Sequence, residues 1–496
     1  MFTNATRDLD QLRQAIYGSA VINPAVAAPM TVNPLLHPAG DARPNSIAVE
    51  GGAFGDEGKG RIVDEVCTTL AASGKHLFVY RWNGGANAGH TVVVDSKKIS
   101  LHQLPSGVLT ENADVILGKG MVLHPGDLVT EIEEVKGRFG GFPAHLHMDE
   151  MAVLALDTHR AFEGALKKWE AGGLGSTGRG IAPAYADVLF RHPMRLRDLI
   201  ASDWRERLGK HYDLYEAFLR GLGQELATST VTALKKSAQP PTVGTKAEFL
   251  DRLAAQVSAI APYIHSVYDL VRQGWHDLAS AWVFEGAQAV GLDSRYGVYP
   301  DITASDPTFD GILPSTEGIV EAADVAVRAG AVKATYTSTV GTRRVPTMME
   351  NPLAQRIRDD AHEYGATTGR PRDIAYIDLP CLGFYARVSR MTHLILTHLD
   401  IAYTDVPIRV CTHYTDSRTG APADYRPDQE FLNTVTPNYV DLPSWDGRAI
   451  LNATDIAKLP TPALQYIDFL TQALATNALF GTTGPERDAL ISWLPA

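Results

Sequence analysis

In the segment GGAFGDEGKGRIVDEV (51–66), the first ten residues carry glycines, two acids and a lysine, and an amphipathic pattern follows. A glycine-rich turn between a strand and a helix binds anions, because backbone N–H groups and the helix dipole face the ligand. The spacing has one residue more than a nucleotide P-loop, and Gly60 stands where that loop has Ser or Thr. Asp56 and Glu57 would repel a phosphate. The loop therefore predicts chemistry beyond phosphate binding, and the alternative is a glycine turn that only packs helix on strand.

Two later glycine-rich segments also carry reactive side chains. RWNGGANAGHT (81–91) ends in His90 and Thr91, a proton donor or phosphate contact beside a backbone that a ligand can approach closely. GSTGRGIAPAYADVLFR (175–191) offers Thr177 and neighbouring polar groups to a second phosphate. Arg191 lies too far along this segment to act at the same place, unless it reaches a different site.

Four more segments complete the set. FEGAQAVGLDSRYGVYPDITAS (284–305) supplies an amide and a hydroxyl, and EYGATTGRPRD (363–373) is suited to binding a carboxylate bidentately. LTHLD (396–400) closes a strand with an acid that could accept the N1–H and N2–H of guanine, and GTTGPER (481–487) is a second candidate base-edge loop. Together these segments imply two nucleotides and a small acid.

The elements that position these loops alternate between strand and helix. Short apolar runs predict strands at 46–52, 76–82, 113–118, 280–288, 331–338 and 392–400. Helical spacing predicts helices between them, including one long helix over 246–274 and a helical C-terminus after a surface excursion at 415–450. This order favours an α/β fold with a large, mostly parallel central sheet flanked by helices.

Composition restricts the function classes. The 496 residues are 45% hydrophobic and carry a formal net charge of −12, which argues against a nucleic-acid-binding face. The three cysteines are far apart, as in a reducing compartment, and we expect a cytoplasmic protein. No apolar run is long enough for a membrane helix.

As a set, GDEGKG, NAGHT, STGRGI with PAY, EGAQ and GATTGRPR resemble the adenylosuccinate synthetase family. The likeness runs in family order from about residue 47 to 490. It implies a P-loop-like, GTP-dependent ligase fold over residues 46–496, preceded by an irregular arm over 1–45. The family joins IMP to L-aspartate with GTP and Mg²⁺, through 6-phosphoryl-IMP, in purine (AMP) biosynthesis.

The resemblance also assigns roles to individual residues. Asp56 becomes the general base and a magnesium ligand, His90 the general acid, and the Gly89 carbonyl a further magnesium ligand. Lys59 and Gln288 fall on positions that contact 6-phosphoryl-IMP. Arg191 matches an arginine that the other subunit supplies, which implies a homodimer. The substrate-binding positions are Asn87, Thr177, Arg191, Thr303, Val340, Thr367, Thr368 and Arg370, and the GTP positions are Gly58, Gly60, Thr91, Arg372, His398, Asp400, Thr483 and Gly484.

The chain departs from the family pattern around the substrate loop and the nucleotide base. His398 replaces the usual lysine, Asp373 adds an acid beside the anion loop, and GTRRVPT (341–347) replaces a glycine-rich turn. These changes leave nucleotide preference open between GTP and ATP, and two other functions open as well. One is a ligase acting on another purine such as (d)GMP, against which Asp56 argues. The other is a non-catalytic nucleotide-binding paralogue, against which the retained Asp56, Lys59 and His90 argue.

Overall fold

A computed structural model describes residues 29–94, 97–169, 176–234, 239–339, 341–364, 371–484, 486 and 489–495. The chain divides into two compact units. Unit 1 comprises residues 1–59, 288–302 and 322–496, and unit 2 comprises residues 60–287 and 303–321. The main-sheet strands of the described residues number ten, five in each unit, so the predicted α/β fold with a large, mostly parallel sheet is confirmed.

The main strands of unit 1 follow the order β20-β19-β15-β11-β1. All neighbours are parallel except β20, which runs antiparallel to β19. The bounds are β1 (Arg43–Gly51), β11 (Val325–Lys333), β15 (His393–Thr397), β19 (Asn477–Thr482) and β20 (Leu490–Ser492). Every residue of β15 is buried, as expected of a parallel strand covered on both faces.

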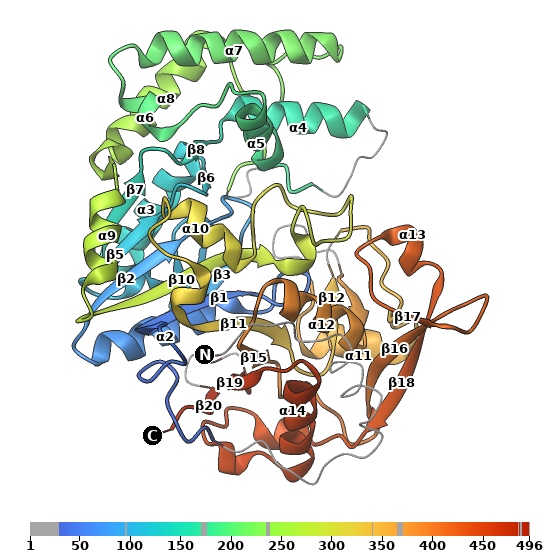
Figure 1. The fold of residues 1–496 in the computed structure, drawn as a ribbon. Helices are drawn as coiled ribbons and strands as arrows, with labels where there is room; N and C mark the ends of the chain where they lie inside the picture. Colours follow the sequence, from blue (N-terminus) through green and yellow to red (C-terminus); the bar gives the residue numbers. More distant parts are fainter. Residues whose placement is uncertain are drawn as a thin grey trace. The chain divides into compact units, whose positions relative to one another are not determined.

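In the described part of unit 1 there are also two smaller sheets and four α-helices (Figure 1). The strands are β12 (Thr337–Thr339), β13 (Asp373–Ala375), β14 (Ile377–Asp378), β16 (Ile408–Asp416), β17 (Pro422–Ala423) and β18 (Val435–Leu442). The helices are α11 (Pro352–Asp360), α12 (Leu379–Val388), α13 (Gln429–Leu432) and α14 (Thr461–Ala473). The predicted surface excursion at 415–450 contains β17, α13 and β18, and β18 pairs with β16.

The main strands of unit 2 follow the order β10-β2-β5-β7-β9, all parallel. Their bounds are β2 (His76–Arg81), β5 (Asp114–Leu117), β7 (His145–Asp149), β9 (Ile264–His265) and β10 (Ser280–Ala289). Short pairs are added by β3 (His90–Val94) with β4 (Lys97–Leu101) and by β6 (Val122–Leu123) with β8 (Val153–Leu154). The predicted segment 81–91 runs from the last residue of β2 to the first two residues of β3.

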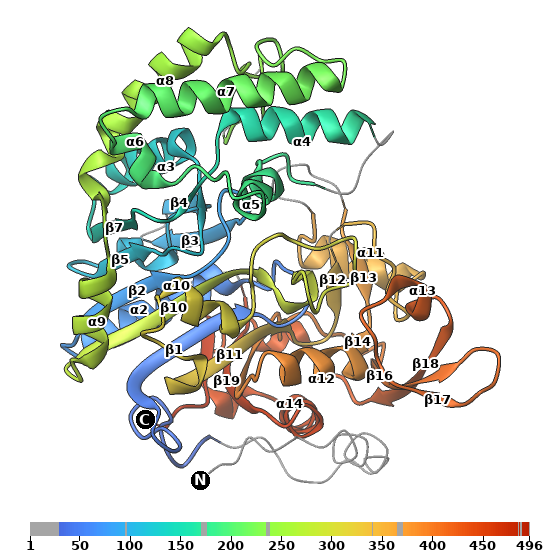
Figure 2. The ribbon, with the colours of Figure 1, turned by 45° about the horizontal axis from the view of Figure 1, so that its top comes forward.

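The described part of unit 2 also contains nine α-helices. They are α2 (Lys59–Ala72), which begins at the unit boundary, α3 (Pro125–Phe139), α4 (Asp157–Trp169), α5 (Ile181–Leu189), α6 (Leu196–Ile200), α7 (Trp204–Gly221), α8 (Lys246–Ile260), α9 (Tyr268–His276) and α10 (Ile312–Ser315). Figure 2 shows α4, α7 and α8 stacked beyond the strands. Among the described residues, no helix has the length and apolar character needed to cross a bilayer.

Three sequence-based predictions of elements are wrong in detail. The single helix over 246–274 is two helices, α8 and α9, because Pro262 lacks an N–H and ends the helical hydrogen bonding. The strand over 331–338 is the end of β11 followed by β12, which pairs with β13 instead of continuing the main sheet. The C-terminus is not wholly helical, since β19 and β20 follow α14.

The predicted arm over residues 1–45 falls partly outside the described residues. Its described part consists of turns and bends until β1 begins at Arg43. Met30 N donates to the carbonyl of Trp493 (2.8 Å), and Leu35 is buried. The arm therefore packs against unit 1 in this stretch, and its role stays a prediction.

Candidate active site

The glycine loop of unit 1 is held by its own second acid. Glu57, almost fully buried, accepts from Gly55 N (2.6 Å) and pairs with Lys59 Nζ at 2.8 Å. A side chain at Gly51 would lie 2.6 Å from the Glu57 carboxylate, so only glycine allows this close packing. Glu57 is thus a structural acid that the sequence reasoning did not separate from Asp56.

Asp56 itself has a left-handed backbone (φ 59°) and a side chain that is 48% exposed. Desolvation acts to raise the pKa of this carboxyl, but Arg372, Lys333, Lys59 and His398 outweigh it and hold the pKa below its usual range. Arg372 forms a direct ion pair with Asp56. The loop acid is therefore ionised and surrounded by positive charge.

A buried network stands behind this ion pair. Glu363 accepts from Lys333 Nζ and from Tyr336 Oη (2.6 Å), and its second oxygen lies 3.7 Å from Arg372 Nε. Desolvation favours the neutral form of Glu363, but Lys333 and these hydrogen bonds lower its pKa. Sequence reasoning missed Lys333 and Glu363. The available signal was a lysine at the end of an apolar strand and an acid beside the TTGRPR loop.

The predicted base-reading residues lie at the carboxyl ends of neighbouring strands β15 and β19. His398 has a left-handed backbone (φ 60°), and its N donates to Thr482 Oγ1 at 3.0 Å. Its ring meets Tyr336 edge-on at 6.0 Å between centroids. Asp400 is half-buried two residues later. Thr482 and His398 thus join the two loops predicted to contact a base.

Thr483 and Gly484 differ in what they can offer a ligand. The buried Thr483 hydroxyl donates to the Ala453 carbonyl at 2.7 Å, so the side chain is used internally. A side chain at Gly484 would lie 2.5 Å from Asn452 Oδ1. Backbone groups, rather than the Thr483 side chain, are what this turn presents.

In unit 2, His90 forms a buried dyad with Glu285. His90 Nδ1 contacts Glu285 Oε1, and Ser106 holds the same carboxylate through its N (2.7 Å) and Oγ (2.8 Å). Burial acts to raise the pKa of Glu285, but His90 and Arg81 lower it. The carboxylate fixes the ring orientation, as in catalytic triads. Glu285 lies in the EGAQ motif, yet sequence reasoning did not assign it a role.

The 83–91 loop is shaped by close backbone contacts. A side chain at Gly85 would lie 2.1 Å from the Val122 carbonyl, and one at Gly60 would lie 2.6 Å from His90 Cβ. Asn87 Oδ1 is buried and has no hydrogen-bond partner among the residues that the structure describes, as expected of a group that binds a ligand. Gly89 is exposed with open space where a side chain would be. Thr91 follows in β3.

The remaining predicted residues lie in separate places. Thr177 is exposed before α5, Arg191 is exposed with a left-handed backbone (φ 62°) after α5, and Thr303 is half-buried, 3.4 Å from Ser305 Oγ. Gln288 belongs to unit 1 and is also left-handed (φ 62°). Val340, Thr367, Thr368 and Arg370 lie outside the described residues.

Comparison with known proteins decides the family. A family model described as adenylosuccinate synthetase matches residues 48–491. The chain is 34% identical over 446 residues to adenylosuccinate synthetase of Xanthomonas campestris pv. campestris (strain B100), which covers 89% of this chain and 97% of that protein. Adenylosuccinate synthetase of Thermus thermophilus is 34% identical over 451 residues, 90% of this chain and 99% of that protein.

The chain belongs to the adenylosuccinate synthetase family. It is a GTP-dependent carbon–nitrogen ligase of purine biosynthesis, as the sequence motifs predicted.

Solved structures agree with this assignment. Fully ligated adenylosuccinate synthetase from Plasmodium falciparum has a TM-score of 0.78 at 28% identity, covering 90% of this chain and 99% of that chain. Cyanophage S-2L succinoaminodeoxyadenylate synthetase, bound to dGMP and dATP, has a TM-score of 0.50 at 16% identity, covering 90% of this chain and 95% of that chain. The second likeness shows the fold alone.

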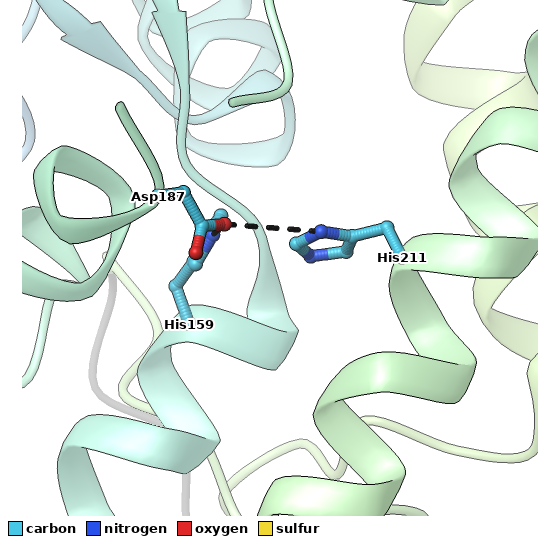
Figure 3. Close-up of side chains that lie close together, drawn as sticks. All are labelled: His159, Asp187 and His211. Carbon is cyan, nitrogen blue, oxygen red and sulfur yellow. Dashed lines mark hydrogen bonds and ion pairs between the residues drawn. The ribbon is translucent and has the colours of Figure 1, made fainter. Parts of the chain in front are cut away.

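One further cluster in this adenylosuccinate synthetase family member has metal-ligand residue types. Among the residues that the structure describes, His159, Asp187 and His211 have ligand atoms within 4.8 Å of one another (Figure 3). His159 Nδ1 accepts from Leu156 N (2.9 Å), so Nε2 carries the proton that it donates to Asp187 (3.0 Å). A metal on Nε2 would displace that proton and leave the ring an anion. The cluster is therefore a hydrogen-bonded network that joins α4, α5 and α7.

Proposed function

We propose that the chain joins IMP to L-aspartate, using GTP, and forms adenylosuccinate through 6-phosphoryl-IMP. The observation that carries the proposal is Asp56, an ionised carboxylate in a glycine loop near Arg372, Lys333 and Lys59. A plain phosphate-binding loop has no use for such an acid. A reaction that must deprotonate a purine beside a transferred phosphoryl group needs one.

Asp56 acts as the general base in this proposal. The O6 of hypoxanthine is a weak nucleophile, and removal of the N1 proton moves negative charge onto it. O6 then attacks the γ-phosphate of GTP, the bond between the γ-phosphorus and the β,γ-bridging oxygen breaks, and GDP leaves. The aspartate amine later displaces inorganic phosphate from C6 of 6-phosphoryl-IMP. The nearby cations keep Asp56 deprotonated before the substrate arrives.

His90 acts as the general acid on the phosphoryl group. Its hydrogen bond to the buried Glu285 carboxylate fixes the orientation of the ring. Phosphoryl transfer spreads charge over the phosphate oxygens, so a positioned donor stabilises the transition state. Gly58, Lys59 and Gly60 lie at the start of α2. They would contact the phosphates of GTP and 6-phosphoryl-IMP.

The residues present also fit Mg²⁺. The half-exposed Asp56 carboxylate and the backbone carbonyl of the exposed Gly89 are oxygen donors of the kind that this hard cation prefers. The family resemblance assigns both groups to the ion. When bound, magnesium neutralises charge on the phosphates.

The other predicted residues divide between the substrates. Asn87, with its unpartnered buried oxygen, supports an IMP site together with Thr177, Gln288 and Thr303. Val340, Thr367, Thr368 and Arg370 would contact aspartate and the ribose. Thr91, Arg372, His398, Asp400, Thr483 and Gly484 would bind GTP, Thr483 and Gly484 through backbone atoms.

Arg191 would serve the IMP site of a second copy, so the proposed enzyme is a homodimer. Leu189 and Phe190, which precede it, are 82% and 74% exposed. Large apolar side chains that are this exposed are typical of a surface that another chain covers, which supports the proposed homodimer. We also place the enzyme in the cytoplasm, since its three cysteines are buried thiols that form no disulfide.

A product assay tests the proposal. Purified protein with Mg²⁺ and aspartate is incubated with each pairing of IMP, GMP or dGMP with GTP or ATP. Adenylosuccinate from IMP and GTP is the expected product. A product from guanylates alone would replace the proposal with the other ligase activity. Binding without any product would identify a non-catalytic paralogue.

A further inference from the structure

Two adjacent arginines in the segment after β12 have opposite environments. Arg343 is 2% exposed, whereas the Arg344 side chain is 70% exposed and reaches Glu350 on the surface. A guanidinium is costly to bury, so its position needs specific contacts. The role of Arg343 is not explained by any substrate contact assigned above.

The buried guanidinium joins three segments of unit 1. One of its NH groups donates to the Gly291 carbonyl (3.4 Å) and the other to the Asp301 carbonyl. The guanidinium carbon lies 4.9 Å from the centre of the Phe54 ring, a cation–π contact. Phe54 belongs to the glycine loop, two residues before Asp56, and packs edge-on against Tyr385.

Neighbouring contacts reinforce the same junction. Thr342 donates to the Asp301 carboxylate through N (2.8 Å) and Oγ1 (2.7 Å). Gly291 N donates to the Ala53 carbonyl at 2.8 Å, and a side chain at Gly291 would lie 2.5 Å from that oxygen. The glycine loop and the segment that follows Gln288 are therefore in direct backbone contact, with Arg343 packed on both.

We propose that Arg343 is a positioning residue that holds the glycine loop, and with it Asp56, against the segment 288–302. The reaction that it serves is the proposed adenylosuccinate synthesis, so its kinetic effect rests on that function. Lysine cannot replace it, because a single ammonium lacks the planar fork that reaches two carbonyls while stacking on an aromatic ring. The residues proposed to read the guanine base, His398 and Asp400, follow β15 and belong to a different segment of unit 1.

The experiment compares Arg343→Met, Arg343→Lys and the matched surface control Arg344→Met. Hydrogen exchange is measured over residues 48–58 and 288–302, with kcat and the KM for GTP measured on the same preparations. Arg343→Met should speed exchange of these segments about tenfold or more, because charge-assisted bonds that close them are lost. It should also lower kcat about tenfold, with the KM for GTP changed less than about twofold, since a misplaced base slows chemistry.

Arg344→Met should match the wild type in both measurements, and Arg343→Lys should resemble Arg343→Met. Unchanged exchange and kcat in Arg343→Met would overturn the proposal. So would faster exchange spread evenly over unit 1, which indicates general destabilisation, or full recovery with lysine. If the wild-type protein forms no adenylosuccinate, the proposed function fails, while the exchange data still test Arg343.

Discussion

The charge of Asp56 depends on residues that lie far apart in the sequence. Lys59 is three residues away, but Lys333, Arg372 and His398 come from other strands and loops of unit 1. Their combined field overcomes the desolvation that would otherwise raise the pKa of this carboxyl. A carboxylate with a lowered pKa is a weak base, so removal of the N1 proton needs a second driving force. In the proposed mechanism, phosphoryl transfer to O6 supplies that driving force.

Asp56→Asn tests this role directly. The amide keeps the shape of the loop but cannot accept the N1 proton, so kcat should fall about 10²–10⁴-fold. Nucleotide binding, measured by calorimetry with GTP, should persist because Lys59 and the loop amides remain. Turnover within a few-fold of wild type would exclude Asp56 as the base.

Glu285→Gln tests the orientation of His90. The amide presents a weaker and uncharged acceptor to the imidazole, so kcat should fall about 10–100-fold through misorientation of the ring. Glu131→Gln is the control. Glu131 is also buried, and its carboxylate accepts backbone N–H groups from Gln103 and Leu104 instead of holding the His90 ring. Equal losses of activity in both variants would point to destabilisation instead of a role in catalysis.

At the scale of elements, buried acids connect helices to sheets. Asp378 caps α12 through Cys381 N (3.2 Å) and also accepts from Tyr414 of β16 and from Thr347 (3.3 Å). Burial raises its pKa to about 6 despite these hydrogen bonds. Asp187 plays a similar part in unit 2, where Tyr215 of α7 (3.0 Å) and His159 of α4 both donate to it. These acids join elements through side chains rather than through strand pairing.

The Asp378 pKa gives a stability prediction with a definite sign. The folded pKa of about 6 exceeds the unfolded value of about 3.9, so the folded state binds the proton more tightly. The stabilisation is complete below about pH 4 and is lost as the pH rises through about 6. Asp378→Asn keeps the helix cap and removes the titration. The wild type should therefore lose on the order of 2–3 kcal/mol relative to this variant between about pH 4 and pH 7.

Urea unfolding of both proteins at several values between about pH 4 and pH 7 measures this difference. Asp441→Asn, a change in a partly exposed acid of β18 that pairs with Arg409, is the control for an altered net charge. A constant difference in unfolding free energy between wild type and Asp378→Asn across this range would contradict the assignment.

At the scale of the whole molecule, the proposed active site needs a second copy. Arg191 follows α5 in a left-handed conformation beside two exposed apolar side chains. An isologous homodimer would exchange the two arginines symmetrically. If Arg191 binds the substrate of the neighbouring chain, its distance from the other polar residues of its own segment is explained.

Mixing two inactive variants tests that exchange. Arg191→Leu lacks the donated arginine, and Asp56→Asn lacks the base, so each homodimer should be inactive. If the arginine acts in trans, hybrids carry one intact site, and an equal mixture after subunit exchange should recover about a quarter of wild-type activity. No recovery, with hybrids confirmed by native mass spectrometry, would place Arg191 in its own subunit's site. Normal activity of the Arg191→Leu homodimer would place it outside any site.

Local patterns in the sequence were enough to identify the family, the α/β class and most of the loops. Glycines, acids and basic residues at fixed spacing indicate which ligand groups a loop can bind. Asp56, His90 and the 83–91 loop could be found this way. The ends of elements were harder to predict from the sequence. The apolar periodicity of 246–274 continues through Pro262, where the helix ends. The pattern of 331–338 does not indicate that its second half pairs with β13.

Which residues act together depends on the folded chain. Glu57 and Asp56 are adjacent acids of similar chemistry, yet Glu57 is buried against Lys59 while Asp56 faces Arg372. Glu285, Glu363 and Arg343 gain their roles from partners at large sequence separation. Burial and distance set the free energy of a charge, and neither quantity is a property of a residue within its local segment.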